Sequence, residues 1–468
     1  MTRARVVHLE LNRFDRIVLS VLLGLAIATG LVVVRGDQVG VQIDTFFPEP
    51  NSTETSTRSE IRITFSEPMD KPSVEQNLSL APPAQGEVDW QGKTLIWRPQ
   101  EALTADTDHI ATLARGVSSV KGRQLKNDLT WTFRTGQPRV AFMSLGDVSQ
   151  LIEIQIDSGS RRNITRFEDG SSVWDYAISR DGSHIAFGLA RPDASAVDLW
   201  LTQSDGSNAR LLVRCDDSQC AGASWSPDGN RLAYERRSLN VDFGAIGMGL
   251  GPSRVWLLDV NSGETAPLFS DNQELGYAPR WSPDGRQLAY FDPEAGVRIV
   301  ELDTGASQLF PNQLGEIGTW SPDSQSVILV DLLFAGEDFF SYLIRADLTD
   351  GTTQVLTDEQ TQISEGSPVW SPTGGWVAFG RKALADDTPT AGQQLWLMRP
   401  DGSDARALVT DANAHLGSVA WSPDGNMIVY LRFPLMQGGA QPEIWYVSLL
   451  DGPPSKLADG ATLPEWIP

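Results

Sequence analysis

The chain has 468 residues, with 37 basic and 60 acidic side chains and a formal net charge of -23. This length exceeds what one compact core usually holds, so we expect several domains. The acidic balance argues against a nucleic acid partner, because a polyphosphate backbone would be repelled over most of the surface. With 2 cysteines and 4 histidines, the composition excludes a cysteine-ligated metal cluster and a scaffold held by many disulfides. The 42 glycines and 28 prolines favour short strands joined by many turns.

Residues 17–34 form a stretch of 18 residues without a charged side chain, bounded by Arg16 and Arg35. At about 1.5 Å per residue a helix over this stretch is about 27 Å long, close to the ~30 Å hydrocarbon core of a bilayer. The preceding residues hold four arginines, so the positive-inside rule predicts a transmembrane signal anchor with residues 1–16 in the cytoplasm and the rest exported. The alternatives are a signal peptide cleaved near residues 26–28 and a buried core helix.

Two cysteines, Cys215 and Cys220, are separated by four residues and lie in the part of the chain predicted to be exported. An oxidising compartment favours a local disulfide between them. A metal site would need further soft ligands, and the sequence offers none nearby. Free thiols are the alternative.

Residues 38–137 contain short runs in which apolar and polar residues alternate, a period of two that is typical of half-buried strands. Turn residues separate the runs at the spacing of a small antiparallel β-sandwich, and the runs are 39–47, 61–65, 94–97, 110–113 and 130–133. The segment resembles the SbsA-type bacterial Ig-like domain in its Phe-Ser-Glu-Pro-Met-Asp element at 65–70 and its Trp-Thr-Phe run at 131–133. The resemblance implies a spacer or adhesive module without catalysis.

From residue 138 onward one unit recurs with the core Trp-Ser-Pro-Asp-Gly or a close variant. The cores begin at Trp225, Trp281, Trp320, Trp370 and Trp421, with a degenerate copy at Ile178. Their spacings of 47, 56, 39, 50 and 51 residues are typical of the four-stranded blades of a β-propeller. The tryptophan supplies a large apolar contact between sheets, and Pro-Asp-Gly supplies a tight hairpin turn. The repeat resembles the TolB-like, tricorn-type propeller, a fold also found in the non-catalytic domain of the dipeptidyl peptidase IV family.

The two ends of this region complement each other. Residues 138–165 hold three expected strands without a tryptophan core, whereas the last six residues hold a core around Trp466 without strands after it. We therefore predict that the fragments share one blade, which gives a seven-bladed propeller over residues 138–468 closed by the C-terminal strand. Six blades with loose ends are the alternative. The predicted fold class is all-β: an N-terminal transmembrane helix, an Ig-like β-sandwich and the propeller.

The long and varied connections of the repeat are predicted to gather on one face of the propeller, and we expect that face to bind a partner. One long connection, over residues 332–341, has an aromatic density that suits a protein interface, supplied by Phe334, Phe339 and Phe340. Folding of these rings back onto the blade is the alternative. The other candidate partner-binding residues lie in two further loops: Phe433, Leu435, Met436 and His415.

The sequence contains no hydrolase nucleophile motif, no phosphate-binding loop and no clustered calcium ligands, so we expect no catalytic residue, cofactor or metal site. The leading hypothesis is a membrane-anchored, extracytoplasmic binding or scaffold protein of a bacterial cell envelope, whose propeller loop face recognises a protein or envelope ligand. An enzyme that uses the axial pocket, and an accessory subunit of a peptidase or secretion complex, are the alternatives.

Overall fold

The computed structural model divides the chain into two compact units, the first within residues up to 133 and the second mainly residues 134–468. It describes residues 21–23, 25, 40–239, 241–242, 248–271, 274–312, 314–336, 338–357, 362–384, 389–436, 438–450 and 452–468. No helix within those ranges has the length and apolar character needed to cross a membrane. The predicted anchor, residues 17–34, lies outside the described residues except for four positions.

The first unit consists of two antiparallel sheets and one short helix. One sheet has the order β1-β2-β5-β4, with bounds Ile43–Phe47, Ile61–Phe65, Thr94–Pro99 and Gly86–Gln91. The other has the order β3-β6-β7, with bounds Leu78–Ala81, Asp108–Leu113 and Leu129–Arg134. The helix α2 spans Lys71–Glu75. Alternation did not predict β3 and β4, because β3 has only four residues and most side chains of β4 are exposed.

An apolar core holds these two sheets together. In β2, Ile61 and Phe65 are buried whereas Arg62 is exposed, so the strand shows the expected period of two. From the other sheet, Trp131 of β7 is buried and contacts Phe46 of β1, with ring centroids 5.2 Å apart. The sandwich predicted from the alternating runs is therefore present.

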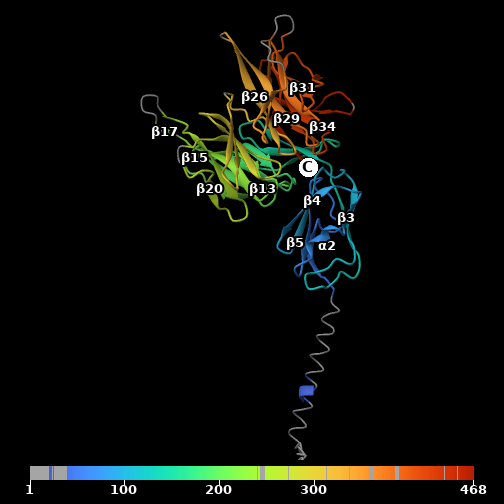
Figure 1. Ribbon diagram of the computed structural model, residues 1–468. Helices are drawn as coiled ribbons and strands as arrows, with labels where there is room; N and C mark the ends of the chain where they lie inside the picture. Colours follow the sequence, from blue (N-terminus) through green and yellow to red (C-terminus); the bar gives the residue numbers. More distant parts are fainter. Residues whose placement is uncertain are drawn as a thin grey trace, which may run out of the picture. The chain divides into compact units, whose positions relative to one another are not determined.

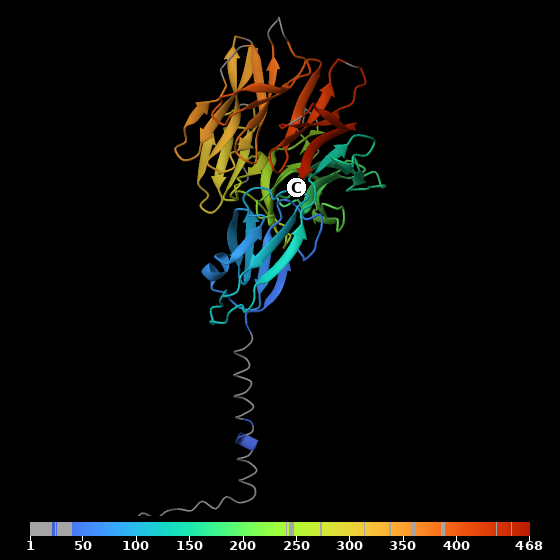
Figure 2. The same cartoon turned by 90° about the vertical axis from the view of Figure 1, so that its right-hand side faces the viewer.

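The second unit is a propeller-like set of four-stranded sheets (Figures 1 and 2). Within the described residues, five of them are separate, and two more are joined into one eight-stranded sheet by a single parallel pair, Val197 of β13 opposite Gln219 of β15, which gives seven groups of four strands. The first four sheets in chain order contain β8 (Arg139–Ser144), β9 (Leu151–Gln155) and β10 (Arg161–Asn163); β11 (Ser172–Ile178), β12 (His184–Ala190), β13 (Val197–Gln203) and β14 (Arg210–Val213); β15 (Ser218–Trp225), β16 (Arg231–Ser238), β19 (Ser253–Asp259) and β20 (Thr265–Pro267); and β21 (Tyr277–Trp281), β22 (Gln287–Asp292), β23 (Gly296–Glu301) and β24 (Ser307–Phe310). A separate two-stranded pair consists of β17 (Val241–Asp242) and β18 (Met248–Gly249).

The remaining three sheets follow the same order of strands. They contain β25 (Thr319–Trp320), β26 (Ser326–Ala335), β27 (Asp338–Asp347) and β28 (Thr353–Val355); β29 (Ile363–Trp370), β30 (Val377–Ala383), β31 (Gln394–Met398) and β32 (Arg406–Val409); and β33 (Ala414–Trp421), β34 (Met427–Pro434), β35 (Glu443–Ser448) and β36 (Ser455–Asp459). The last strand, β37 (Ala461–Ile467), completes the sheet of β8, β9 and β10.

The repeat core or its degenerate copy forms the turn between the first two strands of each sheet except the one that β37 completes. At the first full copy, the buried Ser226 hydroxyl donates to Asp228 Oδ1 (2.6 Å) and accepts the backbone N–H of Arg231 (2.9 Å). Gly229 then takes a φ of 70°, in the left-handed region that favours glycine. The same Ser–Asp hydrogen bond recurs at Ser282, Ser321 and Ser422, with distances of 2.5–2.6 Å. Pro-Asp-Gly therefore acts as the predicted turn.

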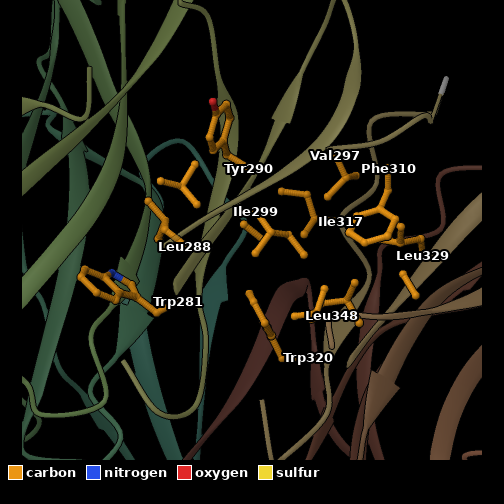
Figure 3. Close-up of a cluster of buried hydrophobic side chains, with 14 of the residues drawn as sticks. Trp281, Leu288, Tyr290, Val297, Ile299, Phe310, Ile317, Trp320, Leu329 and Leu348 are labelled. Carbon is orange, nitrogen blue, oxygen red and sulfur yellow. The ribbon is translucent and has the colours of Figure 1, made fainter. Parts of the chain in front are cut away.

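Four repeat tryptophans connect their sheet to the one before it. Four indole N–H groups donate to a backbone carbonyl of the preceding sheet at 3.0–3.3 Å: Trp225 to Ala177, Trp320 to Arg280, Trp421 to Val369 and Trp466 to Ala420. Apolar clusters fill the spaces between the sheets. Figure 3 shows one of them, in which Ile299, Ile317 and Leu329 from successive segments contribute to a shared layer.

The tail of the chain pairs with the start of the second unit. β37 lies antiparallel to β8, with Trp466 opposite Val140. Val140 and Trp466 also pack against the neighbouring last sheet, in one cluster with its residues Val429 and Ile444. The two fragments that the sequence predicted to share a sheet do share one, whereas six sheets with loose ends would leave both fragments unpaired.

Candidate functional site

Two kinds of connection join the strands of the second unit: short turns such as Ser-Pro-Asp-Gly, and longer, varied segments. The order of strands places these two kinds at opposite edges of the unit. In the last sheet, Trp421 of β33 lies opposite Ile428 of β34 beside the short Ser-Pro-Asp-Gly turn. At the other end of the same two strands, His415 lies opposite Phe433. The link that enters β33 and the connection that leaves β34 are therefore at one edge. We call the edge with these longer connections the loop edge.

The segment predicted as an aromatic loop is a two-stranded ribbon at the loop edge. β26 and β27 each have ten residues and remain paired up to Ala335 and Asp338 (label β26 in Figure 1). The expectation of an irregular loop at 332–341 was wrong, because the strands continue beyond the length of their neighbours. Gly336, with a φ of 70°, lies in the connection between them.

Two phenylalanines form an exposed pair at the end of this ribbon. Phe334 and Phe339 are directly opposite each other in the register, and their exposed fractions are 61% and 65%. Phe340 lies opposite Leu333 on the other face, and both are partly buried. Of the three predicted aromatic residues, two are therefore on the surface and one packs more closely.

The second predicted apolar loop divides in the same way. Phe433 is a residue of β34 and is partly buried, and Pro434 beside it is buried. Leu435 and Met436 follow the strand and are 41% and 71% exposed. The two residues after the strand are thus more exposed than Phe433, whose role in binding stays a prediction.

His415 occupies a packed position in β33. Its Nδ1 accepts the backbone N–H of Gln393 (3.3 Å), and Gly392 and Gly417 lie close enough that a side chain at either position would collide with it. Burial, together with the positive charge of Lys382, lowers the pKa of the imidazole. The ring is therefore held neutral and takes part in packing, and it is absent from the lining of the axial cavity described next.

An axial cavity of about 990 Å³ lies between the innermost strands of the seven sheets. Its wall includes one or more residues of β11, β15, β21, β25, β29, β33 and β37, or of the segments adjoining them. The acidic and basic residues of the wall are Asp175, Arg180, Arg280, Glu316 and Glu465. A cavity of this size could hold a small ligand, so the partners of these carboxylates decide what chemistry is available.

The innermost strands of six sheets contain a shift in pairing register within the described residues. A bulge of this kind leaves one backbone N–H outside the ladder of hydrogen bonds. At several bulges a residue other than glycine takes a φ of about 46–51°: Ala278, Ser367, Ser418 and Leu463. Because L-residues rarely adopt this region, the surrounding structure must hold these positions in place.

Carboxylates from neighbouring segments accept the N–H groups that the bulges release. Glu235 accepts from Ala278 (2.6 Å) and Glu316 from Ser367 (2.6 Å). Asp175 accepts from Gly222 and from Gly188. Burial raises the pKa of both Asp175 and Glu316, and these hydrogen bonds oppose that rise. The acidic groups thus compensate for unpaired backbone donors in a partly desolvated cavity.

Glu465 is a further carboxyl group at the cavity whose pKa is raised. Burial raises this pKa to about 7, while the positive charge of Arg280 and the N–H of Ile178 favour the ionised form and the carboxylate of Asp175 disfavours it. A carboxyl group with a pKa near 7 can act as a general acid or base. His415 does not join it, and the described residues contain no group of three or more side chains arranged to hold a metal ion.

The structure also contains a disulfide between Cys215 and Cys220, with the Cα atoms 6.2 Å apart. Both cysteines are fully buried. The backbone N–H of Cys215 donates to Asp198 (2.7 Å), which also pairs with Arg191. The bridge therefore fixes the link between β14 and β15 at the loop edge.

Comparisons with known proteins found similarities over both units of the chain. Residues 37–135 match the bacterial Ig-like domain family. The Tol-Pal system protein TolB of Gluconobacter oxydans is 24% identical over 58% of this chain and 56% of its own length. The uncharacterized peptidase YuxL of Bacillus subtilis is 22% identical over 40% of this chain and 34% of its own length. A crystal structure of TolB from Acinetobacter baumannii is 12% identical, covers 92% of this chain and 99% of that one, and has a TM-score of 0.43.

This chain thus has a bacterial Ig-like domain followed by a β-propeller region of the TolB/prolyl-oligopeptidase type. It spans about a third of the length of the YuxL relative and just over half that of the TolB relative. The relatives include a Tol-Pal system protein and a protein named a peptidase, so the similarity alone does not give an activity.

Proposed function

We propose that the chain is a membrane-anchored, extracytoplasmic binding or scaffold protein of a bacterial cell envelope. In this proposal residues 17–34 anchor it in the cytoplasmic membrane, and the seven sheets form a closed seven-bladed propeller. The loop edge of that propeller recognises a protein ligand. The uncharged stretch at 17–34 and the arginines before it support the anchor and its orientation.

The observation that carries the binding role is the exposed pair of Phe334 and Phe339. Burying a phenylalanine that was exposed yields about 1.5–3 kcal/mol, and aromatic residues are enriched at the centres of protein interfaces. The pair is presented on a ribbon whose strands are hydrogen-bonded along their whole length. A partner therefore meets a preformed surface, and little conformational entropy is lost on binding. Leu435 and Met436 add exposed apolar area at the same edge.

Affinity capture with the full chain in detergent-solubilised membranes tests this role. We expect the triple variant Phe334→Ser/Phe339→Ser/Phe340→Ser to lose at least 80–90% of the captured partner, as expected for the loss of a binding hot spot of about 1.4 kcal/mol or more. The matched control is Leu309→Ser/Val355→Ser, which changes two side chains of outer strands that are 43% and 48% exposed. Equal capture by the wild type and the triple variant would exclude the aromatic pair as the binding site.

An accessory role beside a peptidase is the second candidate. It is supported by the similarity to YuxL, which is named a peptidase, and by the loop edge as a surface for a second protein. An enzyme that uses the axial cavity has less support, because Glu235, Glu316 and Asp175 are engaged with backbone N–H groups. Identification of the captured protein by mass spectrometry separates these cases: a peptidase or secretion component supports the accessory role, and an unrelated envelope protein contradicts it.

A further inference from the structure

A basic groove lies at one end of the Ig-like domain, in contrast to the acidic character of the chain. The groove has a volume of about 680 Å³, and its lining contains four cationic residues and no acidic one: Arg115, Lys121, Arg123 and Lys126. The chain after residue 35 has 32 basic and 58 acidic residues. A groove lined by four cations and no acidic residue therefore departs strongly from the ratio of basic to acidic residues in this part of the chain. Such a local field attracts anions even when the whole protein is negative.

Two carboxylates near the groove offset part of this charge, and Lys126 has an interaction of its own, so the cations considered available are Arg115 and Lys121. Glu67 pairs with Arg123 at 3.5 Å, and Asp128 accepts the backbone N–H of Arg115 at 2.8 Å. The side chains of Arg115 and Lys121 are exposed, and neither has an ion pair among the described residues. The groove therefore has cationic groups that are available to an external anion.

The groove lies where the chain enters the domain. Gly40, the first residue of the continuous described chain, lines it together with the cations. The backbone N–H of Val41 donates to Gln124 (3.2 Å), which joins this entry point to the segment that carries Lys121 and Lys126. Five residues lie between Val34, the end of the proposed anchor, and Gly40, so the chain from one to the other can reach at most about 22 Å when extended.

An exposed apolar residue accompanies the cations. Val120 is 72% exposed and lies beside Lys121 in a tight turn, in which the N–H of Gly122 donates to Ser119 (2.8 Å). A surface that combines cations with an exposed apolar side chain is typical of protein segments that contact a bilayer interface.

We propose that this groove docks on the anionic phospholipid surface of the membrane that holds the anchor. The inference rests on the proposed anchor, because the short connection is what brings the groove within reach of the headgroups. Lys121 and its neighbours then pair with phosphate groups, and Val120 inserts at the interface. The contact restrains the Ig-like domain near the bilayer.

The test uses the full chain incorporated into vesicles of phosphatidylcholine alone or of phosphatidylcholine with 30% phosphatidylglycerol. Flotation reports association with the vesicles, and the rate of acetylation of Lys121, read by mass spectrometry, reports docking. At 0.1 M salt we expect Lys121 to react at least threefold more slowly on the anionic vesicles, and this protection should disappear at 0.5 M salt. Lys456, in an outer propeller strand, should react equally on both vesicles.

Two variants show whether the groove itself is responsible. Arg115→Gln/Lys126→Gln keeps Lys121 as the reporter and should reduce its protection to less than 1.5-fold. Arg166→Gln/Arg286→Gln removes the same charge at two exposed propeller positions and should leave the protection unchanged. Protection that persists in the first variant, or that inorganic phosphate produces on neutral vesicles, would overturn the lipid surface as the ligand.

The outcomes separate docking from anchoring. Flotation on both vesicles with equal acetylation of Lys121 overturns the docking proposal and leaves the anchor intact. Flotation only on anionic vesicles, reversed by salt, supports docking and refutes the anchor. Flotation on neither type of vesicle overturns both.

Discussion

The substitution Glu465→Gln tests the electrostatics of the axial cavity. The wild-type carboxyl group has a pKa of about 7 in the folded chain, against 4.5 for the group in water. At pH values between 4.5 and 7 the folded state binds the proton of this carboxyl group more tightly than the unfolded state does. The unfolding free energy therefore falls as the pH rises from about 4.5 to above 7. The difference of about 2.5 pH units corresponds to about 3 kcal/mol, which the residual exposure of the side chain reduces to about 2 kcal/mol.

Glutamine keeps an oxygen to accept the N–H of Ile178 and carries no charge at any pH. The variant and the wild type should therefore have equal stability at pH 4.5, and the variant should be more stable by about 2 kcal/mol at pH 8. Urea denaturation followed by tryptophan fluorescence, at intervals of half a pH unit in the same detergent, measures the difference. The contributions of titratable groups that do not interact with Glu465 cancel between the two proteins. A difference that is the same at every pH, or a less stable variant at pH 8, would refute the assignment of a raised pKa to Glu465.

Three further predictions concern stability. The double variant Cys215→Ala/Cys220→Ala should lower the unfolding free energy by about 2 kcal/mol in the same denaturation assay, because the bridge closes a short loop; an unchanged midpoint would contradict this. Ser226→Ala should cost about 1–3 kcal/mol, because it leaves a backbone N–H of the repeat turn without its acceptor, whereas Ser226→Thr, which keeps the hydroxyl, should cost less. Phe334→Ser/Phe339→Ser should change stability by less than about 0.5 kcal/mol because both rings are exposed, and a larger loss in thermal unfolding would mean that they pack in the fold.

The sequence predicted the sheets well because local chemistry specifies their turns. The Ser-Pro-Asp-Gly segments contain the hydroxyl, the carboxylate and the glycine that form each turn, as the contacts of Ser226, Asp228 and Gly229 show. Their spacing then defined the four-stranded units, and Trp466 at the tail indicated the shared sheet. Each of these features depends on residues that are close in the sequence or on a repeated pattern.

The cavity and the ribbon could not be predicted in the same way. Glu316 and Ser367 are 51 residues apart, and nothing in either segment indicates that a carboxylate will accept the N–H of a bulge. Residues such as Ala278 take a positive φ without being glycine, so the bulges have no local signal. At 332–341, Gly336 was the one indication of a turn between two strands, and the apolar residues around it favoured a loop that folds onto the blade or binds a partner.

Site-specific photo-crosslinking in intact membranes tests the binding role of the loop edge most directly. A photoreactive phenylalanine analogue at position 339 should give one discrete adduct of higher mass, because this exposed side chain is proposed to lie in the interface. The same analogue at Val355, an exposed position in an outer strand, should give none. Absence of an adduct at 339, or equal adducts at both positions, would contradict a partner bound at the aromatic pair.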